Sequence, residues 1–199
     1  MNWLAHLVLG GNRPETRLGS LLADTVRRQR EGLPDDFLEG MRRHRRVDAY
    51  MEGHPAVRAS RGRITSIRGR YAPIAVDFLY DHLLVRDWMQ RHPDPLSVFV
   101  DQFEADVVEC ALNLPEAARG LAEWIVASGT LRDYASESGM RLALERYGAR
   151  MSHRLGTPVD LVPCLSDFEA NERGFADDFA VFWRDIARVI AEEFPERGA

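Results

Sequence analysis

The chain has 199 residues, with 26 basic and 31 acidic side chains and a formal net charge of −5. This length predicts one domain over residues 1–199, large enough to bury a core without disulfides. Every basic residue is arginine, which excludes Schiff-base lysine chemistry and the lysine of a phosphate-binding loop. No apolar run reaches the roughly 18 residues of a transmembrane helix. The apolar residues 1–10 lack the basic start and cleavage site of a signal peptide.

The chain has only two cysteines, Cys110 and Cys164. They are too few and too far apart in sequence for a disulfide framework or a thiolate zinc site. We therefore expect a reduced, cytoplasmic setting.

Charge is unevenly distributed along the chain. Residues 13–70 carry 14 arginines against 8 acidic residues, whereas residues 71–199 carry 12 against 23. A basic third on an acidic protein suggests an anionic partner that docks there, and a solvated helix face would give the same pattern. Nucleic acid is disfavoured because no aromatic residues interleave with the arginines.

Apolar residues recur at helical spacing along most of the chain. In chain order they predict helices over residues 17–29, 34–51, 74–91, 95–112, 116–128, 131–155 and 166–194, with a loop or a short helix over 58–70. Gly129 should end one helix, and Gly139 and Gly148 should interrupt the next. Ser166 fits an N-cap, with Glu169 three residues later. Strand alternation is almost absent, so we expect an all-α, single-domain bundle of seven to nine helices.

Two carboxylates lie in the most apolar of these segments. Asp77 and Asp81 are four residues apart, so they share a helix face, and His82 follows directly. A buried carboxylate costs several kcal/mol unless it is paired or bound to a metal. A structural alternative is a buried salt bridge from Arg45 or Arg46 to Asp77.

The first half of the chain repeats this pattern of polar residues in apolar surroundings. His44 and Asp48 are also four residues apart, His6 lies in an apolar run, and Asp24 lies within the first amphipathic helix. Carboxylate oxygens and imidazole nitrogens on helices suit Mn, Fe, Mg or Zn. The alternative is a set of satisfied core histidines and surface acids.

Four segments within residues 1–91 resemble, in the same order, those of the acyl carrier protein phosphodiesterase family. They are MNWLAHLVLG, GSLLADTVRR, HRRVDAYMEGHP and GRYAPIAVDFLYDHLLVRDW. Ser20 stands where the family commonly has Asn, and Met51-Glu52 where it has Thr-Asp. The order Asp81-His82 reverses the His-Asp dyad of the HD-type phosphohydrolases.

The resemblance implies an all-α fold similar to the HD-type metal-dependent phosphohydrolases. It implies hydrolysis of the phosphodiester that joins 4′-phosphopantetheine to a serine of holo-acyl carrier protein, within fatty acid and lipid metabolism. It also implies a divalent cation, Mn²⁺ in the first place, with Mg²⁺ and Fe²⁺ as alternatives. A phosphohydrolase of nucleotides or other small phosphoesters, or a non-catalytic carrier-protein binder, remains a different interpretation. Neither nucleic acid nor a membrane is expected as a partner.

The residues that match the family's motifs form the candidate site. The implied metal ligands are His6, His44, Asp77, Asp81 and His82, and the implied catalytic residues are Asp24, Asp48, Arg45 and Arg70. Arginines expected to bind the acidic carrier protein are Arg27, Arg28, Arg42, Arg43, Arg61 and Arg63. Asp81→Ala is expected to abolish turnover and to leave the melting behaviour unchanged.

Overall fold

The computed structural model describes residues 3–26 and 31–196, and its regular structure there is entirely helical. This confirms the all-α prediction, and the eight helices of seven or more residues fit the predicted number. Among the described helices, none combines the length and apolar character needed to cross a membrane.

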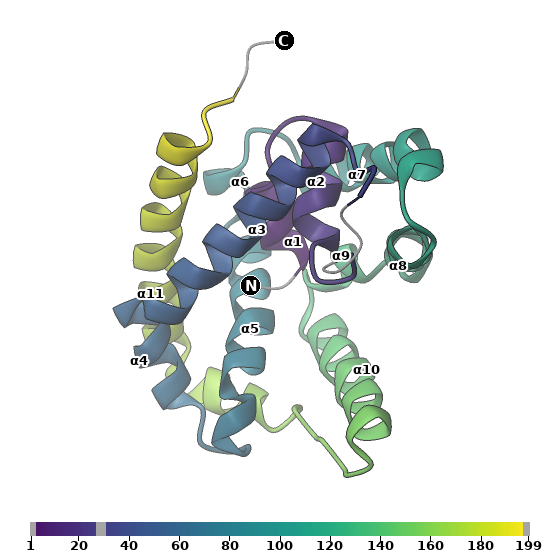
Figure 1. Cartoon of the computed structure of the whole chain (residues 1–199). Coiled ribbons are helices and arrows are strands. Elements are labelled where there is room, and N and C mark those ends of the chain that lie inside the picture. Colours follow the sequence, from purple (N-terminus) through teal and green to yellow (C-terminus); the bar gives the residue numbers. More distant parts are fainter. Residues whose placement is uncertain (1–2, 27–30, 197–199) are drawn as a thin grey trace.

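The elements (Figure 1) are α1 (Trp3–Val8), α2 (Pro14–Leu22), α3 (Asp35–Gly53), α4 (Pro55–Arg63), η1 (Gly69–Tyr71), α5 (Ala72–Arg86), α6 (Trp88–Arg91), α7 (Leu96–Cys110), η2 (Ala111–Asn113), α8 (Glu116–Ser128), α9 (Thr130–Asp133), α10 (Glu137–Leu155) and α11 (Cys164–Glu193).

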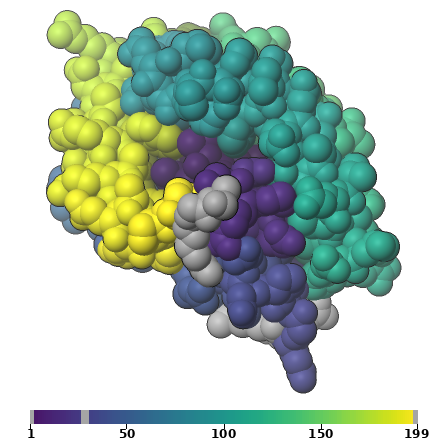
Figure 2. Space-filling model, turned by 90° about the horizontal axis from the view of Figure 1, so that it is seen from above, coloured from purple at the N-terminus to yellow at the C-terminus, as the bar shows by residue number. Residues whose placement is uncertain are grey.

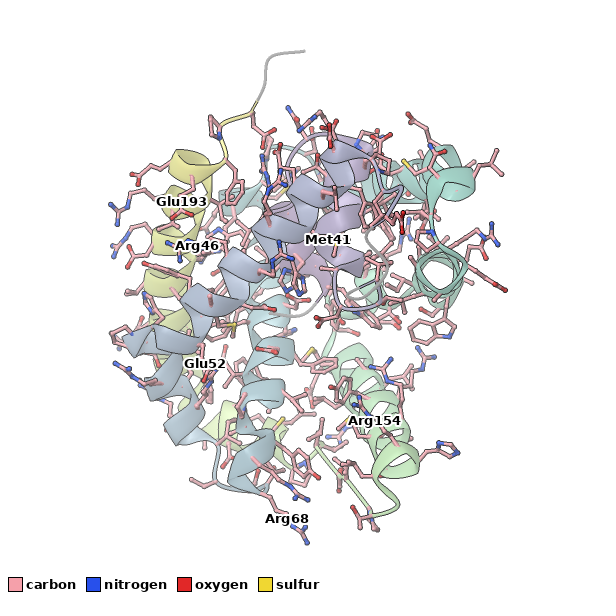
Figure 3. The ribbon with its side chains drawn as sticks, in the orientation of Figure 1. Met41, Arg46, Glu52, Arg68, Arg154 and Glu193 are labelled. Carbon is pink, nitrogen blue, oxygen red and sulfur yellow. The ribbon has the colours of Figure 1, made fainter. Side chains whose placement is uncertain are left out.

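Helix α1 lies inside the molecule. Its Leu4, Ala5 and Leu7 are fully buried. In the space-filling view, the purple N-terminal residues are surrounded by the yellow end of the chain and by the teal segment that follows α5 (Figure 2). The long helices α3 and α11 are joined by Arg46 and Glu193, 2.7 Å apart (Figure 3).

Helices α2 and α3 cross at two glycines. A Cβ on Gly19 would lie 2.1 Å from the carbonyl oxygen of Phe37, and one on Gly40 would lie 2.0 Å from that of Thr16. Real Cβ atoms do not come so close to backbone, so only glycine permits this crossing. It brings the end of α2 against the middle of α3, where His44 lies.

Several helix boundaries differ from the prediction. Helix α2 begins at Pro14, where proline's fixed φ suits the first helical position, and ends at Leu22. The predicted helix over 74–91 divides at Asp87 into α5 and α6. The ambiguous segment 58–70 is part helix and part loop: α4 (Pro55–Arg63) covers its start, residues 64–68 are irregular, and η1 (Gly69–Tyr71) follows.

Two glycines and one serine do not have the predicted roles. Gly139 and Gly148 lie within α10, where a Cβ would meet the carbonyl oxygens of Asp133 and Val159 at 2.0 and 2.7 Å. They allow close packing and do not interrupt the helix. Helix α11 begins at Cys164, directly after Pro163, so Ser166 lies inside it and is not its N-cap.

Candidate metal centre

Three side chains from α1 and α3 meet, two buried imidazoles and one half-buried carboxylate. Nε2 of His6 lies 3.2 Å from Oδ1 of Asp48, and Nε2 of His44 lies 3.1 Å from Oδ2 of the same carboxylate. The two imidazole rings stack with their centroids 4.1 Å apart. One donor atom from each of the three residues lies within 4.8 Å of the others. This is the size of a metal-binding group with two nitrogens and one oxygen.

The histidine nitrogens are arranged to bind a cation. Nδ1 of His44 donates to the carbonyl oxygen of Ser20 at 2.8 Å, and this bond holds the ring with its Nε2 toward Asp48. The acceptor is the backbone carbonyl of residue 20, so this hydrogen bond can form with either serine or the family's asparagine at that position. Burial lowers the pKa of His6 to about 3, against the opposing effect of Asp48, so its ring is neutral at pH 7. Nδ1 of His6 has no hydrogen-bond partner within the described part of the chain.

The carboxylate of Asp48 stays ionised. Burial alone would raise its pKa, but the neighbouring imidazoles of His44 and His6 outweigh burial and hold the pKa well below its usual range. Two imidazoles and one carboxylate therefore converge on a point where a divalent cation could contact all three.

This group opens into a cavity of about 440 Å³. Asp24 lies at its edge, 80% exposed, with Oδ1 3.8 Å from Nε2 of His44. Asp77 lines the same cavity but lies outside the three-residue group, and burial raises its pKa.

Two arginines that the sequence analysis did not single out line the same cavity. They are Arg150 and Arg154 of α10, spaced four residues apart and therefore on one helix face. Figure 3 shows Arg154 on α10, across the molecule from Met41 of α3. The available signal was the spacing of Arg146, Arg150 and Arg154, which places three guanidinium groups along one stripe.

Asp81 has a different contact from the one expected. Its two carboxylate oxygens accept the backbone N–H groups of Leu4 and Ala5, at 2.9 and 3.2 Å, and the residue is fully buried. Burial raises its pKa to about 7, although both N–H donors favour the ionised form. Asp81 thus caps the start of α1, the helix that carries His6, and lies outside the metal-binding group.

This contact reverses the expected outcome of Asp81→Ala. The substitution leaves two buried N–H groups without an acceptor, so we expect unfolding free energy to fall by about 1–3 kcal/mol. Chemical denaturation measures this change in unfolding free energy. Asp167→Ala is the matched control, because Asp167 also accepts two backbone N–H groups, from Thr65 and Ser66, but at an exposed site where water replaces it. Equal losses in the two variants would contradict the capping role.

His82 also lies apart from the metal-binding group. Its Nδ1 donates to the carbonyl oxygen of Tyr134 at 2.8 Å. Its side chain lines a second cavity of about 210 Å³, together with Glu137, Glu169 and Glu172. Neighbouring positions on a helix lie about 100° apart. The side chain of Asp81 therefore reaches the start of α1, whereas that of His82 reaches the backbone of Tyr134.

The two arginines expected to act in catalysis are both exposed and line neither cavity. Arg45 follows His44 on α3. Arg70 lies in η1, where its guanidinium packs over the ring of Tyr71 at 4.7 Å and donates to that residue's hydroxyl. Arg70 is thus held by its neighbour in the chain.

Packing neutralises much of the basic third of the chain. Arg43 was expected to bind a partner, but it is only 2% exposed and pairs with Glu39 and Glu196 at 3.1 and 2.9 Å. Arg61 pairs with Glu52 at 3.0 Å, and Arg63 pairs with Asp178. The acidic end of the chain thus supplies several of the counter-charges. Arg42 is exposed, and the predictions for Arg27 and Arg28 lie outside the described residues.

The fold and the His6–His44–Asp48 group define a class: an all-α protein with a candidate divalent-metal centre in an arginine-edged cavity. Residues 1–186 match the family described as acyl carrier protein phosphodiesterase, and the chain belongs to that family. Acyl carrier protein phosphodiesterase of Pectobacterium atrosepticum is 30% identical over 193 residues, which cover 96% of both chains. Those of Escherichia coli O139:H28 and O9:H4 are 43% identical over 102 residues, half of this chain and 53% of theirs. No solved structure matches the chain.

Proposed function

We propose that the protein is a metal-dependent phosphodiesterase that hydrolyses holo-acyl carrier protein to apo-acyl carrier protein and 4′-phosphopantetheine. The observation that carries this proposal is the His6–His44–Asp48 group, with both imidazoles buried and the carboxylate half-buried, beside a 440 Å³ cavity that two arginines also line. A phosphodiester is an anion that needs cationic groups around its non-bridging oxygens. We infer the substrate from the description of the family to which the chain belongs.

In this proposal, His6, His44 and Asp48 hold the cation, with Mn²⁺ as the first candidate. The bound metal supplies positive charge at the phosphate and activates water. Arg150 and Arg154 hold the non-bridging phosphate oxygens by charge-assisted hydrogen bonds. Asp77 suits proton donation to the departing serine oxygen, because its raised pKa favours the protonated carboxyl.

The carrier protein approaches the open side of the same cavity. Arg42 and Arg45 on α3 and Arg154 on α10 are exposed, and they offer positive charge to an acidic partner. We place the reaction in the cytoplasm, in a single functional unit spanning residues 1–199. Both cysteines are buried free thiols, in keeping with a reducing compartment.

Metal removal tests the proposal directly. Holo-acyl carrier protein is incubated with the protein in Mn²⁺ or in EDTA, and its intact mass is measured. We expect loss of the 4′-phosphopantetheine mass in Mn²⁺ and no loss in EDTA, since the three donors alone cannot neutralise the phosphate. Absence of cleavage with every divalent metal would overturn the proposal and favour a binder or a small-molecule phosphohydrolase.

A further inference from the structure

A third cavity, of about 480 Å³, lies beside the cavity of the metal-binding group. It shares five lining residues with the first cavity: Trp3, Phe78, Leu121, Tyr147 and Arg150. The two spaces therefore adjoin, with Arg150 at their junction. The volume lies within the range of about 300–1,000 Å³ that is typical of small-molecule sites.

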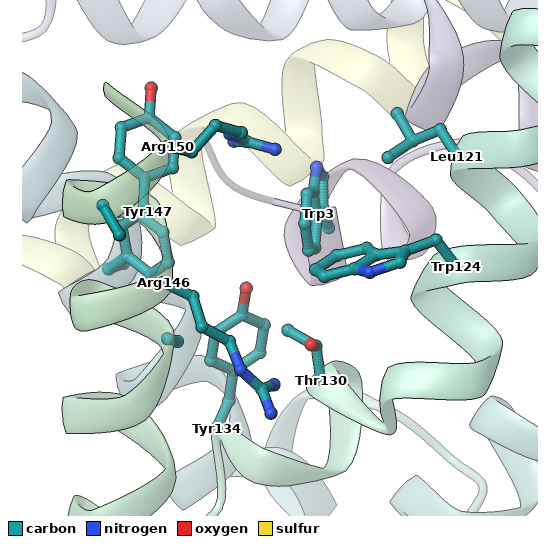
Figure 4. A pocket seen from close by; sticks show the side chains of 11 residues that line it. Trp3, Leu121, Trp124, Thr130, Tyr134, Arg146, Tyr147 and Arg150 are labelled. Atoms are coloured by element: carbon teal, nitrogen blue, oxygen red, sulfur yellow. The ribbon is translucent and has the colours of Figure 1, made fainter. Parts of the chain in front are cut away.

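Five of the eleven residues that line this third cavity are aromatic. Trp3 and Trp124 form an edge-to-face pair with ring centroids 5.8 Å apart, and Figure 4 shows them facing Tyr147 and Arg150 across the space. Trp124 is 44% exposed, which is unusual for so large an apolar side chain. Arg150 lies over the ring of Tyr147, 4.9 Å from its centroid, so its charged end is held at the junction.

Building on the proposed function, we propose that this aromatic pocket binds the prosthetic arm beyond its phosphate. With the phosphate at Arg150, the arm has one continuous space to enter. One methylene after the phosphate oxygen, the arm has a carbon with two methyl groups, which suits aromatic rings. Its amides and thiol follow, and the hydroxyl of Thr130 and the guanidinium of Arg146 line the pocket (Figure 4). The pocket would thus select phosphodiesters that carry a long, partly apolar substituent.

Ala149 gives a way to fill the pocket without disturbing the core. It lines the pocket but is exposed on α10, so a larger side chain there can enter the space while the helix stays intact. Ala149→Phe should lower kcat/KM for holo-acyl carrier protein by at least about tenfold, because the arm loses its position. Ala180→Phe, at an exposed alanine of α11 outside both cavities, is the matched control and should change little.

Methyl p-nitrophenyl phosphate has a methyl group in place of the arm and so reports on the metal centre without filling the pocket, and Ala149→Phe should change its hydrolysis by less than about twofold. Pantetheine without phosphate should change tryptophan fluorescence of the wild type and should bind Ala149→Phe at least about tenfold more weakly.

Cleavage of holo-acyl carrier protein by Ala149→Phe at the wild-type rate would overturn the assignment, as would an equal loss of activity with both substrates. Weaker binding of apo-acyl carrier protein with unchanged binding of pantetheine would assign the pocket to the partner's own side chains. Failure of the proposed function is distinct, because the wild type itself would then not cleave holo-acyl carrier protein.

Discussion

Replacing Asp48 by alanine should lower kcat/KM for holo-acyl carrier protein about a thousandfold, since a metal contributes several kcal/mol and each 1.4 kcal/mol is about tenfold. Asp48 is the anion that faces both imidazoles, at 3.2 Å from His6 and 3.1 Å from His44. Without this anion, two imidazoles alone keep little affinity for a divalent cation. The rate is followed by intact mass, and bound Mn²⁺ by titration calorimetry.

Glu52→Ala is the matched control on the same helix. Glu52 is one turn further along α3, and its carboxylate is 76% exposed and pairs with Arg61. Its removal should change activity by no more than about twofold, as for ordinary surface substitutions. This outcome also tests the departure from the family's Thr-Asp pattern, since a Glu52 ligand would make both variants inactive. Wild-type rate and metal affinity in Asp48→Ala would contradict the assigned centre.

Local patterns predicted most helices because their signals lie within a few residues. The helix over 116–128 is found as predicted, since Pro115 precedes it and Gly129 ends it with φ 64°. Gly139 and Gly148 were misinterpreted because their role depends on backbone from other segments. A glycine at a close approach and a glycine at a helix break look alike in one sequence.

The candidate site shows the same limit of local patterns. The sequence paired His44 with Asp48 because residues one turn apart form a local pattern, and it gave Asp48 a catalytic role, whereas the structure places its carboxylate beside both imidazoles. Asp81 was predicted to bind metal because metal binding and capping of a distant helix both explain a carboxylate among apolar residues. Its acceptor role depends on Leu4, 77 residues away. Arg150 and Arg154 were not predicted, because exposed arginines are common on helices. Only the structure shows that both line the cavity beside His6 and His44.

A buried ion pair fixes the helix that leads to the site. Nε and Nη2 of Arg17 on α2 donate to both oxygens of Asp106 on α7, at 2.6 and 2.8 Å. Asp106 is fully buried and also accepts from Gln102 at 3.0 Å. Helix α2 carries Ser20, whose carbonyl orients His44, so this pair holds one wall of the metal centre in place.

Arg17→Ala should therefore lower the unfolding free energy by about 3–5 kcal/mol, because it leaves a buried carboxylate without its cation. For a chain of this length, the melting temperature should fall by about 10 °C. Calorimetry and chemical denaturation measure the two quantities. Arg188→Ala is the control, since Arg188 is 65% exposed and 4.0 Å from Glu192, and its loss should cost at most about 0.5 kcal/mol.

The double variant Arg17→Met, Asp106→Leu separates charge from packing. Apolar side chains of similar size remove both ions together, so most of the stability lost in Arg17→Ala should return. If the double variant is as unstable as Arg17→Ala, the loss comes from packing and not from the stranded carboxylate. If it is stable but binds Mn²⁺ more weakly than the wild type, the pair serves to position α2, and the orientation of His44 by the Ser20 carbonyl is the link between them.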